Sequence, residues 1–97
     1  MNDRAAIRLA ILQALYAQPG YTANQEVLIN QLKDKGHILD RDQLKIELAW
    51  LDKTADALAD RVIGGIHIAT LTGDGMDAVE GVKEIPGIRR PRPEELP

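Results

Sequence analysis

The fold is decided by the stretch DRDQLKIELAWLDK (residues 40–53) together with ALADRVIGGIHIATL (residues 57–71). In the first stretch, apolar side chains recur three and four residues apart, which predicts an amphipathic helix. Asp40 at its start suits an N-cap, because a short carboxylate can accept the first unpaired amide hydrogens. The apolar positions are Leu44, Leu48 and Leu51, with Ile46, Ala49 and Trp50 beside them.

The second stretch is typical of two strands joined by a tight turn. Gly64-Gly65 suits the positive backbone angles of a two-residue hairpin turn, and apolar residues alternate with polar ones from Ile66 to Leu71. The strand before the turn is predicted from Ala57 to Ile63. Residues 53–59 fit a continuation of the preceding helix equally well, so the start of this strand stays open.

Two more helices are predicted before residue 40. The first covers residues 6–17, with Asn2 or Asp3 as its N-cap. A very short extended piece follows, and a second helix is predicted within residues 24–36, with Asn24 or Thr22 as its N-cap. Glycine at the end of this range stops the second helix.

Beyond the hairpin, Thr72 is predicted to cap a short fourth helix that contains Met76 and Val79. Three glycines, at positions 73, 75 and 81, make this helix intrinsically weak, so it depends on tertiary packing. Residues 1–82 are therefore interpreted as one domain.

The last part of the chain, residues 83–97, is rich in proline and arginine. Such a composition is typical of a segment that forms no packed element, so we predict an extended and solvated tail. The tail holds four basic and three acidic residues, whereas residues 1–82 hold eight basic and twelve acidic ones. The run from Arg89 to Arg92 is thus the most concentrated positive charge.

Length and composition exclude several classes of protein. Ninety-seven residues suffice for one core, and 44% hydrophobic with 28% charged residues is typical of a globular domain. Aromatic residues make up only 3%, too few for a broad base-stacking surface. The absence of cysteine excludes disulfides and cysteine-ligated metals. No apolar run is long enough for a membrane span or a signal peptide, and we expect a cytoplasmic location.

The order of elements predicts a mainly α (α+β) fold: a winged helix-turn-helix with three helices, a β-hairpin wing, a short C-terminal helix and an extended tail. In this interpretation, residues 40–53 form the recognition helix and Gly64-Gly65 the tip of the wing.

Four stretches carry a resemblance to a known family: QPGY at residues 18–21, LAWL at residues 48–51, ATLT with GMDA at residues 69–72 and 75–78, and IPGIRRP at residues 85–91. In these, the chain resembles a group of small winged-helix proteins of Mu-like bacteriophages and prophages, sometimes labelled arsenical-repressor-like transcriptional regulators. The resemblance implies a winged-helix fold and a phage origin. It departs at residues 54–60, where winged helices usually pass through a Gly-Leu pair into the wing.

If the domain binds double-stranded DNA as a transcription regulator, residues 40–53 supply the reading side chains. Arginine and glutamine suit the edges of guanine and adenine in the major groove. However, this segment has three basic and four acidic residues, so its polar side chains fit a merely solvated helix face as well. The candidate DNA-binding residues are Arg41, Gln43, Lys45, Arg61, Arg89, Arg90 and Arg92.

The alternative function is a protein-interaction module that uses the same fold without binding DNA. Ile46 and Trp50 are one helical turn apart on a flank of the predicted recognition helix, and this hypothesis places them, together with the tail, at an interface, with a homodimer as the expected assembly. Trp50 also fits a core anchor, and we expect it to be partly buried. An unknown phage or host protein is a further possible partner.

No motif of a nucleophile or a phosphate-binding loop is present, so the protein is expected not to be an enzyme and to need no cofactor. His37 and His67 lie too far apart to suggest a metal site.

Overall fold

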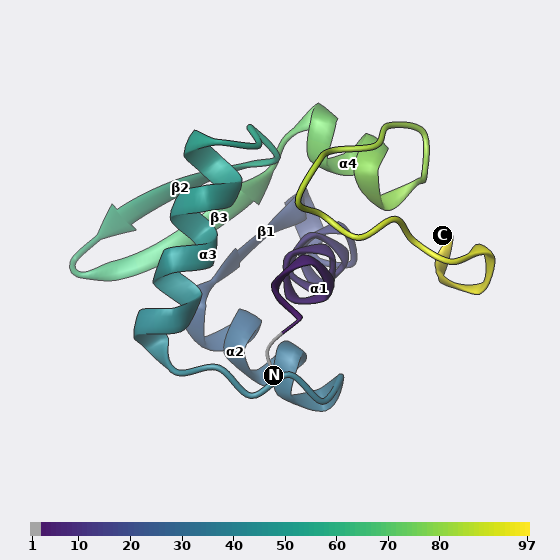
Figure 1. The fold of residues 1–97 in the computed structure, drawn as a ribbon. Coiled ribbons are helices and arrows are strands. Elements are labelled where there is room, and N and C mark those ends of the chain that lie inside the picture. The colour runs from purple at the N-terminus through teal and green to yellow at the C-terminus, as the bar shows by residue number, and fades with distance from the viewer. Residues whose placement is uncertain (1–2) are drawn as a thin grey trace.

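The structure, a computed structural model, describes residues 3–97 of the chain. This part contains four α-helices and a three-stranded antiparallel sheet, which makes it an α+β fold whose order of elements is compatible with a winged helix (Figure 1). Two 3-10 turns, Pro19–Tyr21 and Pro93–Glu95, complete the elements. The helices and strands are α1 (Arg4–Tyr16), β1 (Thr22–Asn24), α2 (Gln25–Asp34), α3 (Arg41–Lys53), β2 (Leu58–Ile63), β3 (Ile66–Leu71) and α4 (Gly73–Val79).

Each helix begins behind a capping side chain that its sequence predicts. The side chains of Asp3, Asn24, Asp40 and Thr72 each accept a backbone hydrogen bond from the first turn of α1, α2, α3 and α4, respectively. Such bonds satisfy amide groups that have no partner within the helix. The alternative cap of α1, Asn2, lies outside the described residues.

The hairpin forms as predicted, and it is joined by a third strand. Gly64 and Gly65 both have positive φ, at 58° and 79°, and β2 and β3 pair from Leu58↔Leu71 to Ile63↔Ile66. The short extended piece before α2 is β1, which pairs with the other edge of β3, so the strand order is β1-β3-β2.

The open question at residues 53–59 is resolved in favour of a strand. α3 ends at Lys53, and Asp56 takes the left-handed conformation with φ 53° before β2 starts at Leu58. Aspartate tolerates this region better than most residues do, because its short side chain can hydrogen-bond locally. Asp56 therefore turns the chain between α3 and β2.

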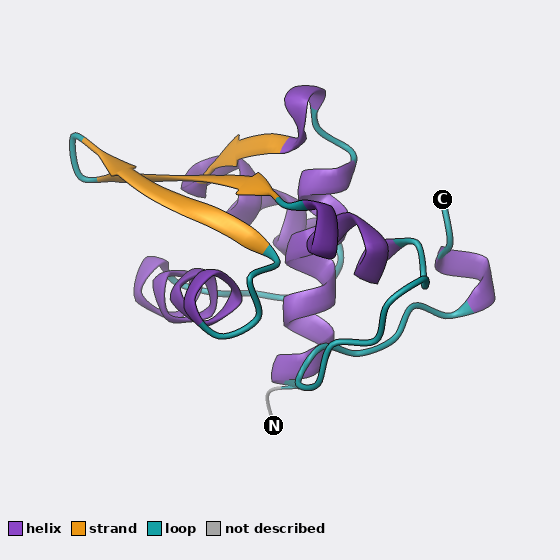
Figure 2. Cartoon of the chain, turned by 90° about the horizontal axis from the view of Figure 1, so that it is seen from above, coloured by secondary structure: helices purple, strands orange, loops and turns teal. Residues whose placement is uncertain are grey.

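One aliphatic core holds the elements together, and α1 lies at its centre (Figure 2). Eight residues of α1 are buried, which leaves this helix with little solvent-facing surface. Leucines supply most of the fully buried volume, and burial of each stabilises the fold by roughly 1.5–3 kcal/mol. The largest fully buried side chains are Leu9, Ile11, Leu12, Leu15, Leu28, Leu32, Leu44, Leu48, Leu51 and Leu58.

Gly75 lowers the helix propensity of α4, but packing requires a glycine at this position. A Cβ atom at this position would lie 2.0 Å from the backbone oxygen of Ala57 and 2.6 Å from Leu71 Cδ1. Thr72 fixes the same approach, because its amide donates to the Ala57 oxygen and its hydroxyl to the Asp56 oxygen. The first turn of α4 thus packs against the start of β2 only because residue 75 has no side chain.

The prediction that residues 83–97 form a solvated tail is wrong. Ile85 and Ile88 are only 9% and 7% exposed and belong to the same core as the helices. The Arg89 amide donates to the Ala5 oxygen, which holds the segment against the first turn of α1 (Figure 1). Two isoleucines among the prolines supply the apolar area that anchors the segment.

Candidate functional site

Helix α3 carries the side chains that were predicted to read DNA, and two of the three have partners within the chain. Arg41 Nη2 lies 2.7 Å from Glu26 Oε1 of α2. The Gln43 side-chain oxygen accepts from the Asp40 amide at 3.1 Å, as part of a capping box. Lys45 is exposed and has no ion pair within residues 3–97.

Glu47, also on α3, is not part of a solvated helix face, so that interpretation is wrong for this residue. Its side chain is only 7% exposed, and its two carboxylate oxygens accept from Arg4 Nε and Arg8 Nε of α1, each at 2.8 Å. Burial by itself would raise the pKa of Glu47, but the hydrogen bonds and charges of the two arginines outweigh burial and hold the pKa below its ordinary value. The ion cluster therefore joins α3 to α1.

Trp50, the predicted interface residue, is half-buried and is covered within its own chain. The Arg8 guanidinium carbon lies 3.7 Å from the centre of the Trp50 ring, a cation–π contact. Arg8 Nη1 also donates to the Gly87 oxygen at 3.0 Å. Gly87 has φ 90°, and a Cβ there would lie 2.7 Å from the indole, so only glycine fits. Trp50 thus anchors the C-terminal segment.

Two of the three tail arginines, Arg89 and Arg90, have side-chain partners within the chain, whereas Arg92 is held through its backbone amide. Arg89 forms two 3.0 Å hydrogen bonds with the Glu95 carboxylate, and Arg90 Nη1 lies 3.6 Å from Glu84 Oε2. The Arg92 amide donates to the same Glu95 carboxylate at 2.8 Å. The contacts that Glu95 makes with Arg89 and Arg92, above all the hydrogen bond from Arg89, lower the pKa of Glu95 to about 2. Within residues 3–97, the exposed Arg92 side chain forms no ion pair, so the tail presents one uncompensated arginine rather than a cluster of three.

The end of the hairpin is apolar rather than basic. Val62, Ile63 and Ile66 are 58%, 57% and 47% exposed. Ile63 faces Ile66 across the two strands, and Val62, the preceding residue of β2, points to the opposite face of the hairpin. Arg61 is exposed and, within the described part of the chain, has no ion pair.

At the free edges of the hairpin, side chains accept hydrogen bonds from backbone amides. The Asp60 amide on the outer edge of β2 donates to the Asp52 carboxylate at 2.9 Å. Where β1 no longer covers β3, the His67 amide donates to the Gln25 side chain at 2.8 Å. Because these amides are taken, addition of a foreign strand at either edge is disfavoured.

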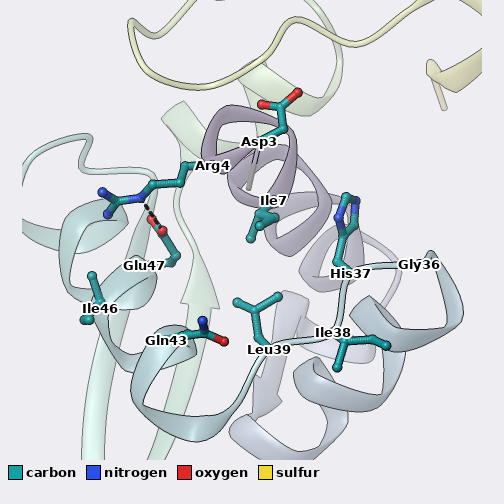
Figure 3. Close-up of a pocket in the computed structure, with 10 residues that line it drawn as sticks. All are labelled: Asp3, Arg4, Ile7, Gly36, His37, Ile38, Leu39, Gln43, Ile46 and Glu47. Atoms are coloured by element: carbon teal, nitrogen blue, oxygen red, sulfur yellow. Dashed lines mark hydrogen bonds and ion pairs between the residues drawn. The ribbon is translucent and has the colours of Figure 1, made fainter. Parts of the chain in front are cut away.

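A cavity of about 410 Å³ lies between the start of α1, the α2–α3 connection and α3 (Figure 3). Ile7 and Leu39 line it, and the Arg4–Glu47 pair borders it. Ile38 and Ile46 lie at its rim and are 81% and 56% exposed. The cavity is therefore a mixed apolar and charged hollow.

The two histidines lie in different places. His37 lines the cavity next to α1, whereas His67 Nδ1 lies 3.0 Å from both carboxylate oxygens of Asp60 in the hairpin. Among residues 3–97, no group of three or more His, Asp or Glu side chains is placed to hold a metal ion. In the same residues, no helix is long and apolar enough to cross a bilayer.

Sequence reasoning missed the cluster around Glu47 because its members are distant along the chain. Arg8 and Glu47 are separated by 39 positions, and each is flanked by apolar residues that predict a buried helix face. Opposite charges within two buried stripes are the signal that points to a pair, since an unpaired charge is too costly to bury.

Comparison with other proteins finds two relatives. The chain is 33% identical to the uncharacterized protein gp26 of Escherichia phage Mu over 86 residues, which cover 89% of this chain and 88% of that protein. It is 31% identical to an uncharacterized protein of Haemophilus influenzae (strain ATCC 51907 / DSM 11121 / KW20 / Rd) over 65 residues, 67% of this chain and 63% of the relative. No family model matches the chain, and no solved structure does.

Proposed function

Since the chain belongs to the same family as gp26 of Escherichia phage Mu, we propose that it is a non-enzymatic protein of Mu-like phages and prophages that binds a protein partner through the end of its hairpin. In this proposal the domain is a winged helix, β2–β3 is its wing, and the protein acts in the cytoplasm of the host cell.

The exposed aliphatic side chains at the hairpin end carry this proposal. Val62, Ile63 and Ile66 lie together where a DNA-binding wing would present cations, and all three are about half exposed or more. Contiguous apolar surface on a soluble domain is unfavourable in water, so it commonly marks a protein contact. Ile63 and Ile66 project from one face of the hairpin end and Val62 from the other, so each face exposes an aliphatic side chain, which suits insertion into an apolar groove of a partner.

The occupied edges of the hairpin favour this mode of contact over strand addition. Asp52 and Gln25 accept the edge amides of Asp60 and His67. A partner would therefore contact side chains on the faces of the hairpin rather than extend the sheet. Arg61 lies on the same face as Ile63 and Ile66, so an acidic group beside the partner's apolar groove would complement it.

Affinity capture with a matched pair of variants tests the proposal. The wild type and the Ile63→Asp/Ile66→Asp double variant are immobilised and exposed to nuclease-treated extract of cells in which a Mu-like prophage is induced. We expect the wild type to retain a protein that the double variant loses and that binds again when purified. Ile38→Asp, an 81% exposed isoleucine outside the hairpin, is the control and should retain it. Identical retention by all three chains would contradict the proposal.

DNA binding as a transcriptional regulator of the arsenical-repressor kind is the second candidate. Lys45 on α3 and Arg61 in the hairpin favour it, because both are exposed and neither forms an ion pair among the described residues. Against it, Arg41, Arg89 and Arg90 are each paired with a glutamate. The geometry thus supports weak rather than strong attraction to phosphates.

Binding to labelled duplex DNA over a series of salt concentrations tests this second candidate. If Lys45 and Arg61 each contact one phosphate, the logarithm of the association constant should fall with the logarithm of salt concentration with a slope of about −2. Lys45→Glu and Arg61→Glu should each weaken binding and flatten the slope, while Lys33→Glu on α2 should not. Absence of binding at low salt would leave the hairpin as the functional surface.

A further inference from the structure

The side of α3 that faces away from the core carries a stripe of four exposed residues. Asp42, Ile46, Ala49 and Lys53 are spaced by four, three and four positions, which places them on one face of a helix. This stripe lies opposite Leu44, Leu48 and Leu51, which are buried. Ile46 is 56% exposed at its middle.

The chemistry of this stripe is self-complementary. An acid lies at the N-terminal end, a base at the C-terminal end, and a large and a small apolar residue lie between them. If two such helices pack antiparallel around a twofold axis, Asp42 of each copy faces Lys53 of the other, and Ile46 faces Ala49. A parallel arrangement would place like charges together, which is strongly unfavourable at an interface.

The preference of helices for acids near their start and bases near their end explains only part of this pattern. It accounts for Asp42 and Lys53, which stabilise the dipole of α3. It does not account for an exposed isoleucine midway between them, next to an alanine small enough for a second helix to approach. Neither Asp42 nor Lys53 forms an ion pair in the described part of this chain.

We propose that two copies of this chain associate through their α3 helices, antiparallel and around a twofold axis between Ile46 and Ala49. The contact is isologous, so each copy presents the same stripe and the assembly stops at a dimer. The helix has 13 residues, or about 20 Å of length, so the contact is small and the dimer is concentration-dependent rather than permanent.

This dimer goes beyond the proposed function and does not depend on it. The hairpin end is not part of the stripe, and it stays exposed in the dimer for another partner. Lys45 flanks the stripe on the same helix, so the dimer and the reading of DNA by α3 exclude each other. Trp50, predicted at first as an interface residue together with Ile46, remains covered by Arg8 within its own copy.

Sedimentation equilibrium of charge-swapped variants tests the arrangement, with loading concentrations from low micromolar to millimolar. The wild type should show a monomer–dimer equilibrium. Asp42→Lys or Lys53→Asp alone should weaken association at least about tenfold, because each creates two like-charge contacts. Ile46→Asp should abolish association. The hairpin variant Val62→Asp should dimerise as the wild type does, even if it loses a partner.

A mixture of the two single variants is the decisive measurement. In the antiparallel arrangement, a copy with Asp42→Lys presents two bases to the two acids of a copy with Lys53→Asp, so the mixture should form a heterodimer that neither variant forms alone. Loss of helix stability in the single variants cannot produce such recovery. A monomeric wild type at all concentrations, or a mixture that stays monomeric, would overturn the proposal.

Discussion

On the side of α3 that faces α1, the charged groups are paired inside the chain, whereas on the opposite side Asp42, Lys45 and Lys53 have no ion pair among the described residues. Glu47 on the inner side is buried between two arginines, and its neighbour Ile46 on the outer side is 56% exposed. Adjacent residues of one helix thus reverse the usual distribution of charged and apolar groups. The inner side joins the helix to its own chain, and the outer side is where a partner can bind.

The largest expected effect is a loss of stability when Glu47, on the inner side of α3, is replaced. Glu47→Ala leaves Arg8, whose side chain is 10% exposed, without its counter-charge. Removal of one partner of a buried pair typically costs about 3–5 kcal/mol, and urea unfolding should show a loss of this size. Lys45→Ala on the outer side is the control and should change the free energy of unfolding by less than about 0.5 kcal/mol. Equal effects of the two substitutions would remove the distinction between the sides.

Two glycines allow the contact between the tail and Trp50 to be measured separately from backbone strain. Gly87 and Gly64 both have positive φ, but only Gly87 lies against the indole. Gly64→Ala should cost about 1–2 kcal/mol, from the left-handed conformation alone. Gly87→Ala should cost roughly 1–3 kcal/mol more, because the new methyl group overlaps Trp50.

Thermal unfolding and the tryptophan emission spectrum check this second prediction. In Gly87→Ala the emission should move toward longer wavelength, because displacement of the tail exposes Trp50 to water. Gly64→Ala should leave the spectrum unchanged. If both variants lose the same stability, the tail does not press against the indole in solution.

The elements of this fold could be predicted from local sequence, because their signals are local. Asp40 and Thr72 cap helices through bonds to residues three positions later. Gly64-Gly65 specifies its turn by backbone conformation alone. These residues need no knowledge of the rest of the chain, and the structure confirms their predicted roles.

The remaining features depend on contacts between distant segments. Glu47 looks like a solvated residue until Arg4 and Arg8 of α1 are placed against it. Gly75 looks like a weakness of α4 until the Ala57 oxygen is found where its side chain would lie. The proline-rich tail looks solvated because its composition hides two isoleucines that reach the core. In each case tertiary packing determines the outcome, and a single sequence does not show which segments meet.

A smaller expected effect tests the Arg89–Glu95 ion pair of the tail, whose contribution to stability should depend on pH. The folded pKa of Glu95 is about 2, below its ordinary value of 4.5. The carboxylate therefore stabilises the docked tail above about pH 4.5, and this contribution is lost as the pH falls through that value toward 2. The difference in unfolding free energy between the wild type and Glu95→Gln should be largest near neutral pH and should shrink on acidification. A difference that is constant with pH would show that Arg89 and Glu95 are not coupled.

The smallest expected effect concerns Arg41, the cation of α3 that pairs with Glu26. Both side chains are largely exposed, at 70% and 52%, so a double-mutant cycle of Arg41→Ala and Glu26→Ala should give a coupling of about 0.2–1 kcal/mol that salt reduces. A coupling in this range means that DNA must compete with Glu26 for Arg41. A coupling of zero would make Arg41 as available as Lys45. The salt-dependence slope expected for DNA binding would then steepen from about −2 to about −3, and the outer side of α3 would suit nucleic acid better than its pairing suggests.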